Sequence, residues 1–376
     1  MKKLFLVILA GLALYGQALA CTSAIVTAQR SSEGAPILWK HRDSGAKCNT
    51  RVEYVTSSGY AYTAIVPNTK AWNKSVLAGI NEKAFGIFNT ATHDLPKATQ
   101  EEYDAVQLKK TGGFASLMSQ ALKKCATVDE FEELLKNTKR KNGFNTNYGV
   151  GDATGAVAYF EVWDLGYKRY NVNEMSEGYD IRANFSHAAT GKKGTSVRRY
   201  NVVKRQMKAH NGNFSPQDFM AYSRSYNSVK YGNILASEKT YVCSNHSVAR
   251  ATSVSAIAMV CDGKNPRMLV VNGHPVPGLA LPVYVNAGKE IPKCLNGEKM
   301  RVLCNDFQGV AYKKLGKKKY QLNKEVASAV LKVKQPVVEM PKAMPEDIKK
   351  FNARLDKMYN KHEKKVRKVI NRYSAQ

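Results

Sequence analysis

The feature that most constrains this chain is the junction between an apolar leader and a cysteine at position 21. Two lysines precede an apolar run over residues 4–15, which is too short to span a bilayer comfortably. The run leads to Ala18-Leu19-Ala20, which places small residues where a signal peptidase needs them, directly before Cys21. We therefore predict a signal peptide over residues 1–20. The mature chain would be exported to the periplasm or the extracellular space and would begin with Cys21.

A second interpretation of the same junction stays open. In a lipoprotein signal the cysteine becomes lipidated, and the third residue before it is normally a large aliphatic one, whereas this chain has Ala18 there. A lipidated Cys21 could not act as a nucleophile. The alternative is a non-enzymatic lipoprotein, anchored at Cys21, that binds anionic envelope polymers.

Charge is distributed unevenly along the 376 residues. The formal net charge is +28, and residues 311–376 hold 19 Lys and Arg against 6 Asp and Glu. This charge favours anionic surfaces, and with an export signal we expect an anionic envelope surface, bound through the basic tail, rather than nucleic acid. We predict one domain over 21–310, followed by a basic linker and a C-terminal helix over 311–376. Self-association is left open.

The pattern along the chain is typical of an α+β protein. Small and β-branched residues over 21–26 and an apolar run over 36–40 flank a turn, which predicts a hairpin with Cys21 at the tip of its first strand. A second hairpin is expected within 147–164. Thr127 with Glu130 three residues later predicts a capped helix, and apolar residues at helical spacing predict others.

Seven cysteines are present, and six remain when Cys21 is set aside. An even number in an exported chain permits up to three disulfides, and buried free thiols are the alternative. No paired Cys/His spacing indicates zinc, and no dinucleotide or phosphate-binding fingerprint occurs. We expect neither a metal nor a cofactor.

An N-terminal cysteine is a compact catalytic unit. Its thiol can attack an amide or ester carbonyl, and its own α-amine can accept and return the proton. The resulting thioester is then hydrolysed by water. Such a site also needs donors for the oxyanion, a carboxylate that holds the amine, and cations that shape the pocket; positive charge near the thiol activates it further.

Several motifs after Cys21 follow one another in a recognisable order. They are Cys21-Thr22-Ser23, Lys40-His41-Arg42-Asp43, Gly79-Ile80-Asn81-Glu82-Lys83-Ala84-Phe85, and pieces within 147–162, 183–185, 196–200 and 252–275. In this order the chain resembles, over about 21–285, the linear amide C–N hydrolases of the N-terminal-nucleophile group. That group includes choloylglycine hydrolases, penicillin V acylases, acid-ceramidase-type amidases and penicillin acyltransferase-like hydrolases.

The resemblance implies a fold and an activity. The implied fold is a four-layer αββα sandwich, with two antiparallel sheets between helices, to which this chain adds a basic helical extension. The implied reaction is hydrolysis of a linear, non-peptide amide in a small molecule through a thioester acyl-enzyme, and acyl transfer to an amine would use the same intermediate. N-acyl amino acids, N-acyl homoserine lactones, bile-salt conjugates and penicillin V all remain open as substrates.

The resemblance also implies roles for particular residues. Cys21 matches the nucleophile and base, and Asp43 matches the aspartate that orients the α-amine. Asn184 matches the asparagine near the reacting carbonyl, which implies an oxyanion donor. Arg199, or Arg198 beside it, matches a late arginine that supports the site.

Two positions depart from the family pattern. A gapless match puts Lys40 where the family has its early arginine, and Arg42 could reach the same space. We favour Arg42 because its guanidinium is a forked donor with delocalised charge. The family's earlier asparagine falls on Ala91 in a gapless match, and Asn89 is the nearest candidate.

Overall fold

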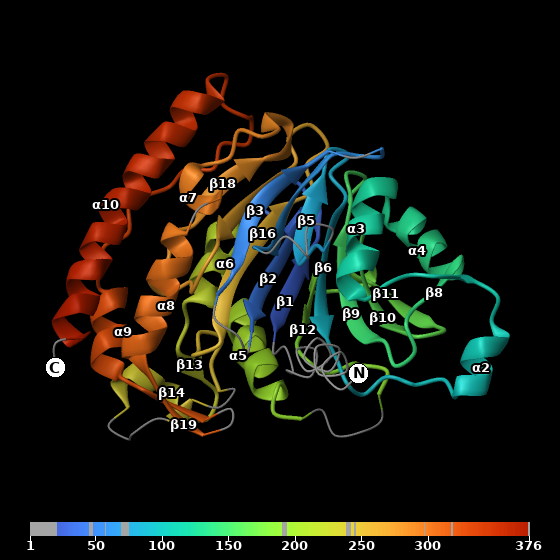
Figure 1. Ribbon diagram of the computed structural model, residues 1–376, viewed down its shortest axis with the longest axis horizontal. Coiled ribbons are helices and arrows are strands. Elements are labelled where there is room, and N and C mark those ends of the chain that lie inside the picture. Colours follow the sequence, from blue (N-terminus) through green and yellow to red (C-terminus); the bar gives the residue numbers. More distant parts are fainter. Residues whose placement is uncertain are drawn as a thin grey trace, which may run out of the picture.

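The computed structural model describes residues 21–374, apart from 45–47, 57, 69–74, 190–193, 238–241, 244–245, 297 and 317–318. The predicted signal peptide over 1–20 lies outside the described residues. The α+β class is confirmed: two large antiparallel sheets face each other, and helices lie outside them (Figure 1).

The first sheet has six strands in the order β12-β1-β2-β16-β17-β18. Its strands are β1 (Thr22–Val26), β2 (Ile37–Asp43), β12 (Tyr179–Arg182), β16 (Ser253–Val260), β17 (Arg267–Val271) and β18 (Leu281–Tyr284). The predicted hairpin at the start of the mature chain is confirmed, because β1 and β2 pair antiparallel with Ser23 opposite Lys40. This hairpin places Cys21 at one end of the sheet, directly before β1.

The second sheet has seven strands in the order β11-β10-β9-β6-β5-β4-β3. Its strands are β3 (Thr50–Val55), β4 (Tyr62–Pro67), β5 (Ala78–Asn81), β6 (Gly86–Ala91), β9 (Asn145–Gly151), β10 (Val157–Trp163) and β11 (Tyr167–Asn171). The predicted hairpin within 147–164 is the β9–β10 pair. The central strands of this sheet face β1, β2 and β16 of the first.

Strand alternation divides the apolar side chains among three layers. Ile25 and Leu38 of the first sheet meet Phe88 of the second between the sheets. The outer face of the second sheet packs against helices α3 (Phe114–Lys124) and α4 (Val128–Lys136). The outer face of the first packs against α5 (Val197–Lys208) and α6 (Pro216–Ser223). The elements therefore lie in the order helix, sheet, sheet, helix.

The helices begin where their sequences predict. Thr127 caps α4 by accepting the backbone N–H of Glu130, while the Glu130 carboxylate accepts the backbone N–H of Thr127. Ser215 caps α6 in the same way, with Pro216 at the first helical position. These caps satisfy backbone N–H groups that a helix start leaves unpaired.

The remaining elements lie at the sides of the two sheets. They are α2 (Gln100–Ala105), β7 (Lys109–Lys110), β8 (Thr138–Lys139), β13 (Asn227–Ser228), β14 (Gly232–Asn233), β15 (Val242–Cys243), α7 (Lys293–Asn296), α8 (Lys299–Ala311), β19 (Tyr312–Gly316), β20 (Lys319–Leu322), α9 (Lys324–Leu331) and α10 (Ile348–Ser374). None of the helices in the described part of the chain combines the length and the hydropathy of a membrane span.

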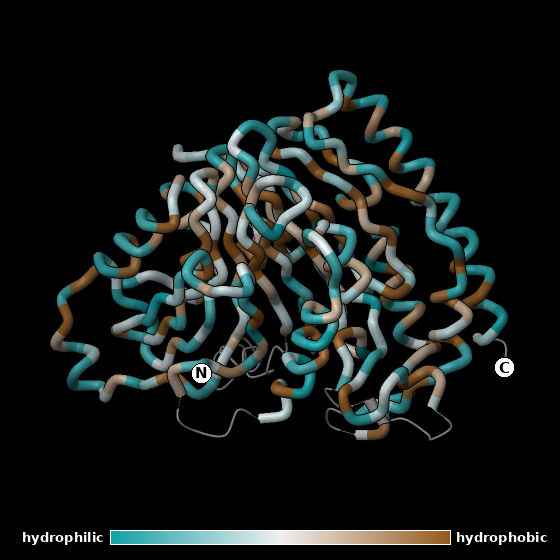
Figure 2. Tube along the Cα trace, turned by 180° about the vertical axis from the view of Figure 1, so that it is seen from behind, coloured by the Kyte–Doolittle hydropathy of each residue, from teal (hydrophilic) through white to brown (hydrophobic). Residues whose placement is uncertain are grey.

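The predicted C-terminal helix is α10, which runs along one side of the molecule (Figure 1). Leu355 and Tyr359 belong to the same apolar cluster as the side chains between the sheets, and Val366 and Ile370 pack with α8 and α9. Its outer side is strongly hydrophilic (Figure 2). The exposed cations of α10 form what we call its cationic face. They are Lys349, Lys350, Arg354, Lys357, Lys361, Lys364, Lys365, Lys368 and Arg372. The division of the chain near residue 310 stays a prediction, although β20 pairs with β15 across it.

Candidate active site

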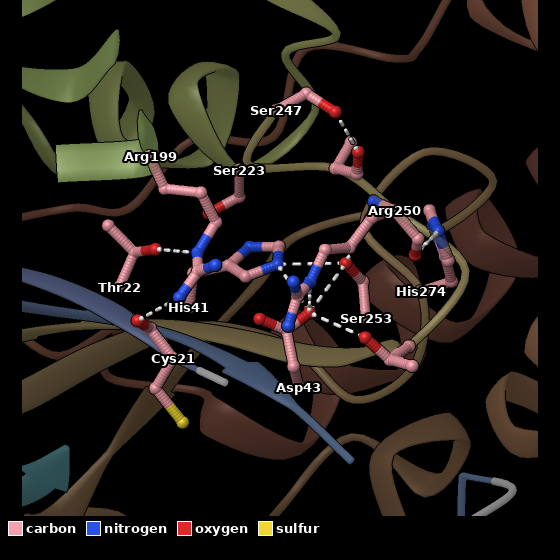
Figure 3. A network of polar contacts seen from close by, with 12 residues as sticks. Cys21, Thr22, His41, Asp43, Arg199, Ser223, Ser247, Arg250, Ser253 and His274 are labelled. Atoms are coloured by element: carbon pink, nitrogen blue, oxygen red, sulfur yellow. Dashed lines mark hydrogen bonds and ion pairs between the residues drawn. The ribbon is translucent and has the colours of Figure 1, made fainter. Parts of the chain in front are cut away.

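Cys21 lies at the edge of the space between the sheets. Its side chain is 2% exposed. Because side chains alternate along a strand, Ser23 and Ile25 share its direction toward the second sheet, whereas Thr22 and Ala24 face helices α5 and α6. Figure 3 shows the sulfur directed away from Arg199, which lies on the helix-facing side. The thiol and the backbone nitrogen of Cys21 thus meet different sets of groups.

Asn184 and Arg199 surround the backbone of Cys21. The backbone nitrogen of Cys21 donates to Oδ1 of Asn184 over 2.6 Å. Arg199, fully buried on α5, donates through Nη2 to the same oxygen over 2.8 Å and to the carbonyl oxygen of Cys21 over 3.3 Å. Its Nε donates to Thr22 Oγ1 over 3.2 Å, as Figure 3 shows. Arg199 rather than Arg198 therefore reaches the cysteine; Arg198 contacts His246.

The partners of Asn184 settle which way its amide points. Arginine and a backbone nitrogen can only donate, so the atom that they share must be the amide oxygen. The amide nitrogen in turn donates to the carbonyl oxygen of Ala91 over 2.7 Å. Asn184 thus accepts a hydrogen bond from the backbone nitrogen of Cys21 through its amide oxygen. The sequence assigned an amine-orienting role to Asp43 and an oxyanion role to Asn184, but the structure places Asn184 at this nitrogen.

Asp43 lies in a neighbouring buried network on the helix-facing side of β2. Its Oδ1 accepts from Ser253 over 3.1 Å and pairs with Arg250 at 3.1 Å and with His41 at 3.5 Å. Burial opposes its ionisation, but Arg250 and His41 outweigh burial and hold the pKa of Asp43 well below its usual range. Within the described ranges, no contact joins Asp43 to Cys21. The alternation of β2 explains this, because Asp43 shares its face with His41 and not with the thiol.

His41, Ser253 and Asp43 resemble a serine triad only in composition. The same nitrogen of His41, Nε2, contacts both Ser253, at 2.9 Å, and Asp43. A triad needs the carboxylate on the opposite ring nitrogen, and in the described structure Nδ1 of His41 has no hydrogen-bond partner. Burial also lowers the pKa of His41, although Asp43 opposes that shift. The network therefore connects β2 to β16 and does not build a second nucleophile.

Lys40 and Arg42 both extend from β2 toward the second sheet. Residues two apart on a strand share a face, so the sequence alternatives of Lys40 or Arg42 lie side by side. Lys40 contacts the Cys21 side chain and donates to the backbone oxygen of Asn89 and to Thr90 Oγ1. Burial lowers the pKa of Lys40, and Cys21 partly offsets this shift. Lys40 is thus the cation hydrogen-bonded beside the thiol, in the place that the gapless match indicated.

Asn89 is in β6, but its side chain does not reach Cys21. Its neighbour Phe88 points between the sheets and Ile87 points to α3 and α4. Alternation therefore turns the Asn89 side chain outward, where Nδ2 donates to Thr146 over 3.3 Å. Only its backbone oxygen faces the site, and the same is true of the Ala91 oxygen that holds Asn184. The sequence prediction of Asn89 as an oxyanion donor is not met by this geometry.

Sequence reasoning missed two residues of this site. Thr90 bridges Lys40 to Ser23, with 3.1 Å between the two hydroxyl oxygens. Asn147, opposite Thr90 on β9, donates to the backbone oxygen of Phe185 over 3.0 Å and so supports the segment that carries Asn184. Polar residues in otherwise apolar central strands were the available signal, because such residues need a buried partner.

Within the described ranges, no three His, Cys, Asp or Glu side chains gather as metal ligands do. The six described cysteines, Cys21, Cys48, Cys125, Cys261, Cys294 and Cys304, are buried and unpaired. Cys48 and Cys304 nevertheless contact each other.

No model of a known protein family matches the chain, and no curated protein matches it either. Among solved structures it is similar to a conjugated bile acid hydrolase from Clostridium perfringens, with 10% identity and a TM-score of 0.46, over 71% of this chain and 93% of that one. An N-acylethanolamine-hydrolyzing acid amidase ortholog from Caenorhabditis elegans has 15% identity and a TM-score of 0.43, over 64% and 93%. A penicillin V acylase from Agrobacterium tumefaciens has 10% identity and a TM-score of 0.42, over 71% and 86%. At TM-scores below 0.5 these likenesses carry no argument, and the function has to be inferred from the site itself.

Proposed function

We propose that the chain is an exported amidohydrolase that cleaves linear, non-peptide amides in small molecules with Cys21 as an N-terminal nucleophile. One observation carries this proposal: a half-buried asparagine and a fully buried arginine are arranged around the backbone nitrogen of residue 21. Such an arrangement serves catalysis when that nitrogen is a free amine. The junction after Ala20 is where a signal peptidase would release it.

Cys21 itself provides both groups that exchange the catalytic proton, the thiol and the α-amine. The α-amine, whose ordinary pKa lies near neutral pH, accepts the proton of the Cys21 thiol as the sulfur bonds to the substrate carbonyl. The amine then gives this proton to the leaving nitrogen as the C–N bond breaks, which yields an amine product and a thioester on Cys21. Water, activated by the same α-amine, hydrolyses the thioester. Asn184 holds the amine in place, and the Lys40 ammonium lies beside the Cys21 side chain.

Two alternatives differ from this reading in their chemistry. Acyl transfer uses the same thioester and replaces water by an amine acceptor. The lipoprotein reading instead attaches a diacylglycerol to the Cys21 sulfur. The contacts that Asn184 and Arg199 make with the backbone of Cys21 favour the enzyme here, because a lipid anchor needs neither of them.

The test compares the secreted protein with a Cys21→Ala variant on a panel of N-acyl amides. We expect intact mass to show a chain starting at Cys21, and turnover to fall by a factor on the order of 10⁴ or more in the variant. Cys125→Ala is the matched control, because Cys125 is buried between the second sheet and its helices. Turnover by the Cys21→Ala protein, or fatty chains on Cys21, would refute the proposal.

A further inference from the structure

Arg42 differs from the other cations around Cys21 in having donors without acceptors. Its Nε and Nη1 atoms are buried and have no hydrogen-bond partner in the described structure. No ion pair joins it to a carboxylate within the described ranges; the adjacent Asp43 pairs with Arg250 instead. Burial lowers the pKa of Arg42, but the nearby Cys21 and Asp43 oppose this shift.

The position of Arg42 brings these donors to the reacting group. Antiparallel pairing puts Thr22 opposite His41, and continuing this register by one residue puts Cys21 opposite Arg42. Directly opposite residues have Cβ atoms about 5 Å apart. Arg42 also shares the face of Lys40, which contacts the sulfur. A substrate whose carbonyl lies at the Cys21 sulfur would therefore have its neighbouring atoms within reach of the Arg42 guanidinium.

Other buried arginines of the chain show what a structural role looks like. Arg140 directs its guanidinium at four backbone carbonyl oxygens. The guanidinium nitrogens of Arg182 also lack hydrogen-bond partners, but Arg182 pairs with carboxylates, lying 2.9 Å from Asp180 and 3.5 Å from Glu161, and has two tyrosine rings beside it. Unsatisfied buried donors destabilise a fold and call for an explanation. Arg42 has neither the carbonyl partners of Arg140 for its Nε and Nη1 atoms nor, among the described residues, the carboxylate partners of Arg182.

Lys40 cannot take the place of Arg42 as a ligand for substrate. Its ammonium has three N–H groups, and its three neighbours are the Asn89 oxygen, Thr90 Oγ1 and the Cys21 side chain. Arg42 therefore supplies the cation with free donors next to the nucleophile. A guanidinium with unused donors on two of its nitrogens, Nε and Nη1, matches a carboxylate in charge and in hydrogen-bonding capacity.

We infer that Arg42 binds a carboxylate of the substrate, so that the preferred substrates are amides that carry a carboxylate next to the scissile bond. This inference rests on the proposed function, and it divides the substrate classes that the sequence left open. N-acyl amino acids carry such a group, whereas N-acyl homoserine lactones are neutral. The carboxylate can belong to the amine part, as in an N-acyl amino acid, or to the acyl part, as in the monoamide of a dicarboxylic acid.

The experiment measures binding without turnover, in the mature chain with Cys21→Ala. Calorimetry compares N-hexanoyl homoserine with its lactone, in which the carboxylate and the side-chain hydroxyl are joined in a neutral ester. The monoamide of glutaric acid and its methyl ester test the acyl side in the same way. We expect the protein to bind the acid of one pair about ten- to one-hundredfold more tightly than its neutral partner. This ratio of affinities corresponds to the usual strength of a hydrogen bond to a charged group. Arg42→Met should reduce that preference to about one. Arg354→Met on the cationic face of α10 is the control and should preserve it.

The outcomes separate this inference from the proposed function. A parent protein that binds both members of each pair equally overturns the inference, and so does an Arg42→Met protein that keeps the preference. If Arg42→Met weakens acid and neutral ligand by the same factor with an unchanged melting temperature, the arginine has a different role and the inference also fails. If binding shows the Arg42-dependent preference but the Cys21 protein turns over none of the acids, the proposed function fails and Arg42 remains a carboxylate-binding residue.

Discussion

Replacing Asn184 by Asp tests whether the α-amine of Cys21 is the catalytic base. The change converts a neutral oxygen 2.6 Å from the backbone nitrogen into a carboxylate. A negative charge at that distance stabilises the protonated amine, which cannot accept the thiol proton. An adjacent opposite charge typically shifts a titration by about one to three pH units. We expect the lower part of this range, because Arg199, 2.8 Å from the same oxygen, neutralises part of the new charge.

The assay is kcat/KM as a function of pH on an N-acyl amide that the parent enzyme cleaves. In Asn184→Asp the acidic limb of the profile should move upward by about one to two pH units, with roughly a tenfold loss at pH 7 for each unit. Activity should recover at higher pH. Asn184→Ala is the control: it removes every contact of the amide and adds no charge, so its rate should fall without an upward shift of the limb.

Stability is monitored in parallel, because either change removes the hydrogen bond from Asn184 to the Ala91 oxygen. This loss destabilises the fold by about 1–3 kcal/mol, which thermal unfolding detects. A folded Asn184→Asp protein whose acidic limb coincides with that of the parent would show that the nitrogen of Cys21 is not the base. The mechanism proposed for Cys21 would then be wrong.

Other predictions concern stability, surface and redox state. Burial lowers the pKa of His274 to about 3, so the buried neutral form stabilises the fold above pH 6.5. We expect the free energy of unfolding to fall by up to about 5 kcal/mol as the pH drops from 6.5 toward 3. His274→Asn should flatten the pH dependence of urea unfolding in that window. Deleting 345–376 should lower the urea midpoint strongly, since α10 completes two core clusters, and an unchanged midpoint would contradict this. Reversing Lys361 and two other charges on the cationic face should instead preserve folding and amide hydrolysis, and weaken cosedimentation with anionic vesicles at low salt. Oxidation by a small disulfide should join Cys48 to Cys304, which are in contact; peptide mapping that finds both thiols free would refute this.

The local elements followed from the sequence because their causes are local. Strand alternation, a turn and the cap at Thr127 act over a few residues, and the structure has the corresponding hairpins and helix. The α+β class followed from the same patterns. No local pattern predicts which strands face each other. The two-sheet arrangement was therefore expected only from the resemblance to the linear amide hydrolases.

The members of the site were easier to predict than their roles. Cys21, Asn184 and Arg199 meet as expected, but Asp43 faces a network with Arg250 and has no contact with Cys21 among the described residues. The face on which each side chain lies depends on strand register, and a shift of one residue reverses it. Asn89 is a second example, because its position in β6 turns its side chain away from the thiol.

The sequence by itself determined that cations lie two residues apart on the strand that follows Cys21 and that the chain alternates strands with capped helices, and it predicts a cleavable leader before Cys21. Only the tertiary structure decided that Asn184, 163 residues away, accepts from the nitrogen of Cys21. It also decided that Lys40 has partners for its charge whereas Arg42 has unused donors. The physical reason is that hydrogen-bond satisfaction of a buried group depends on every neighbour in three dimensions, whereas sequence patterns report only the neighbours along the chain.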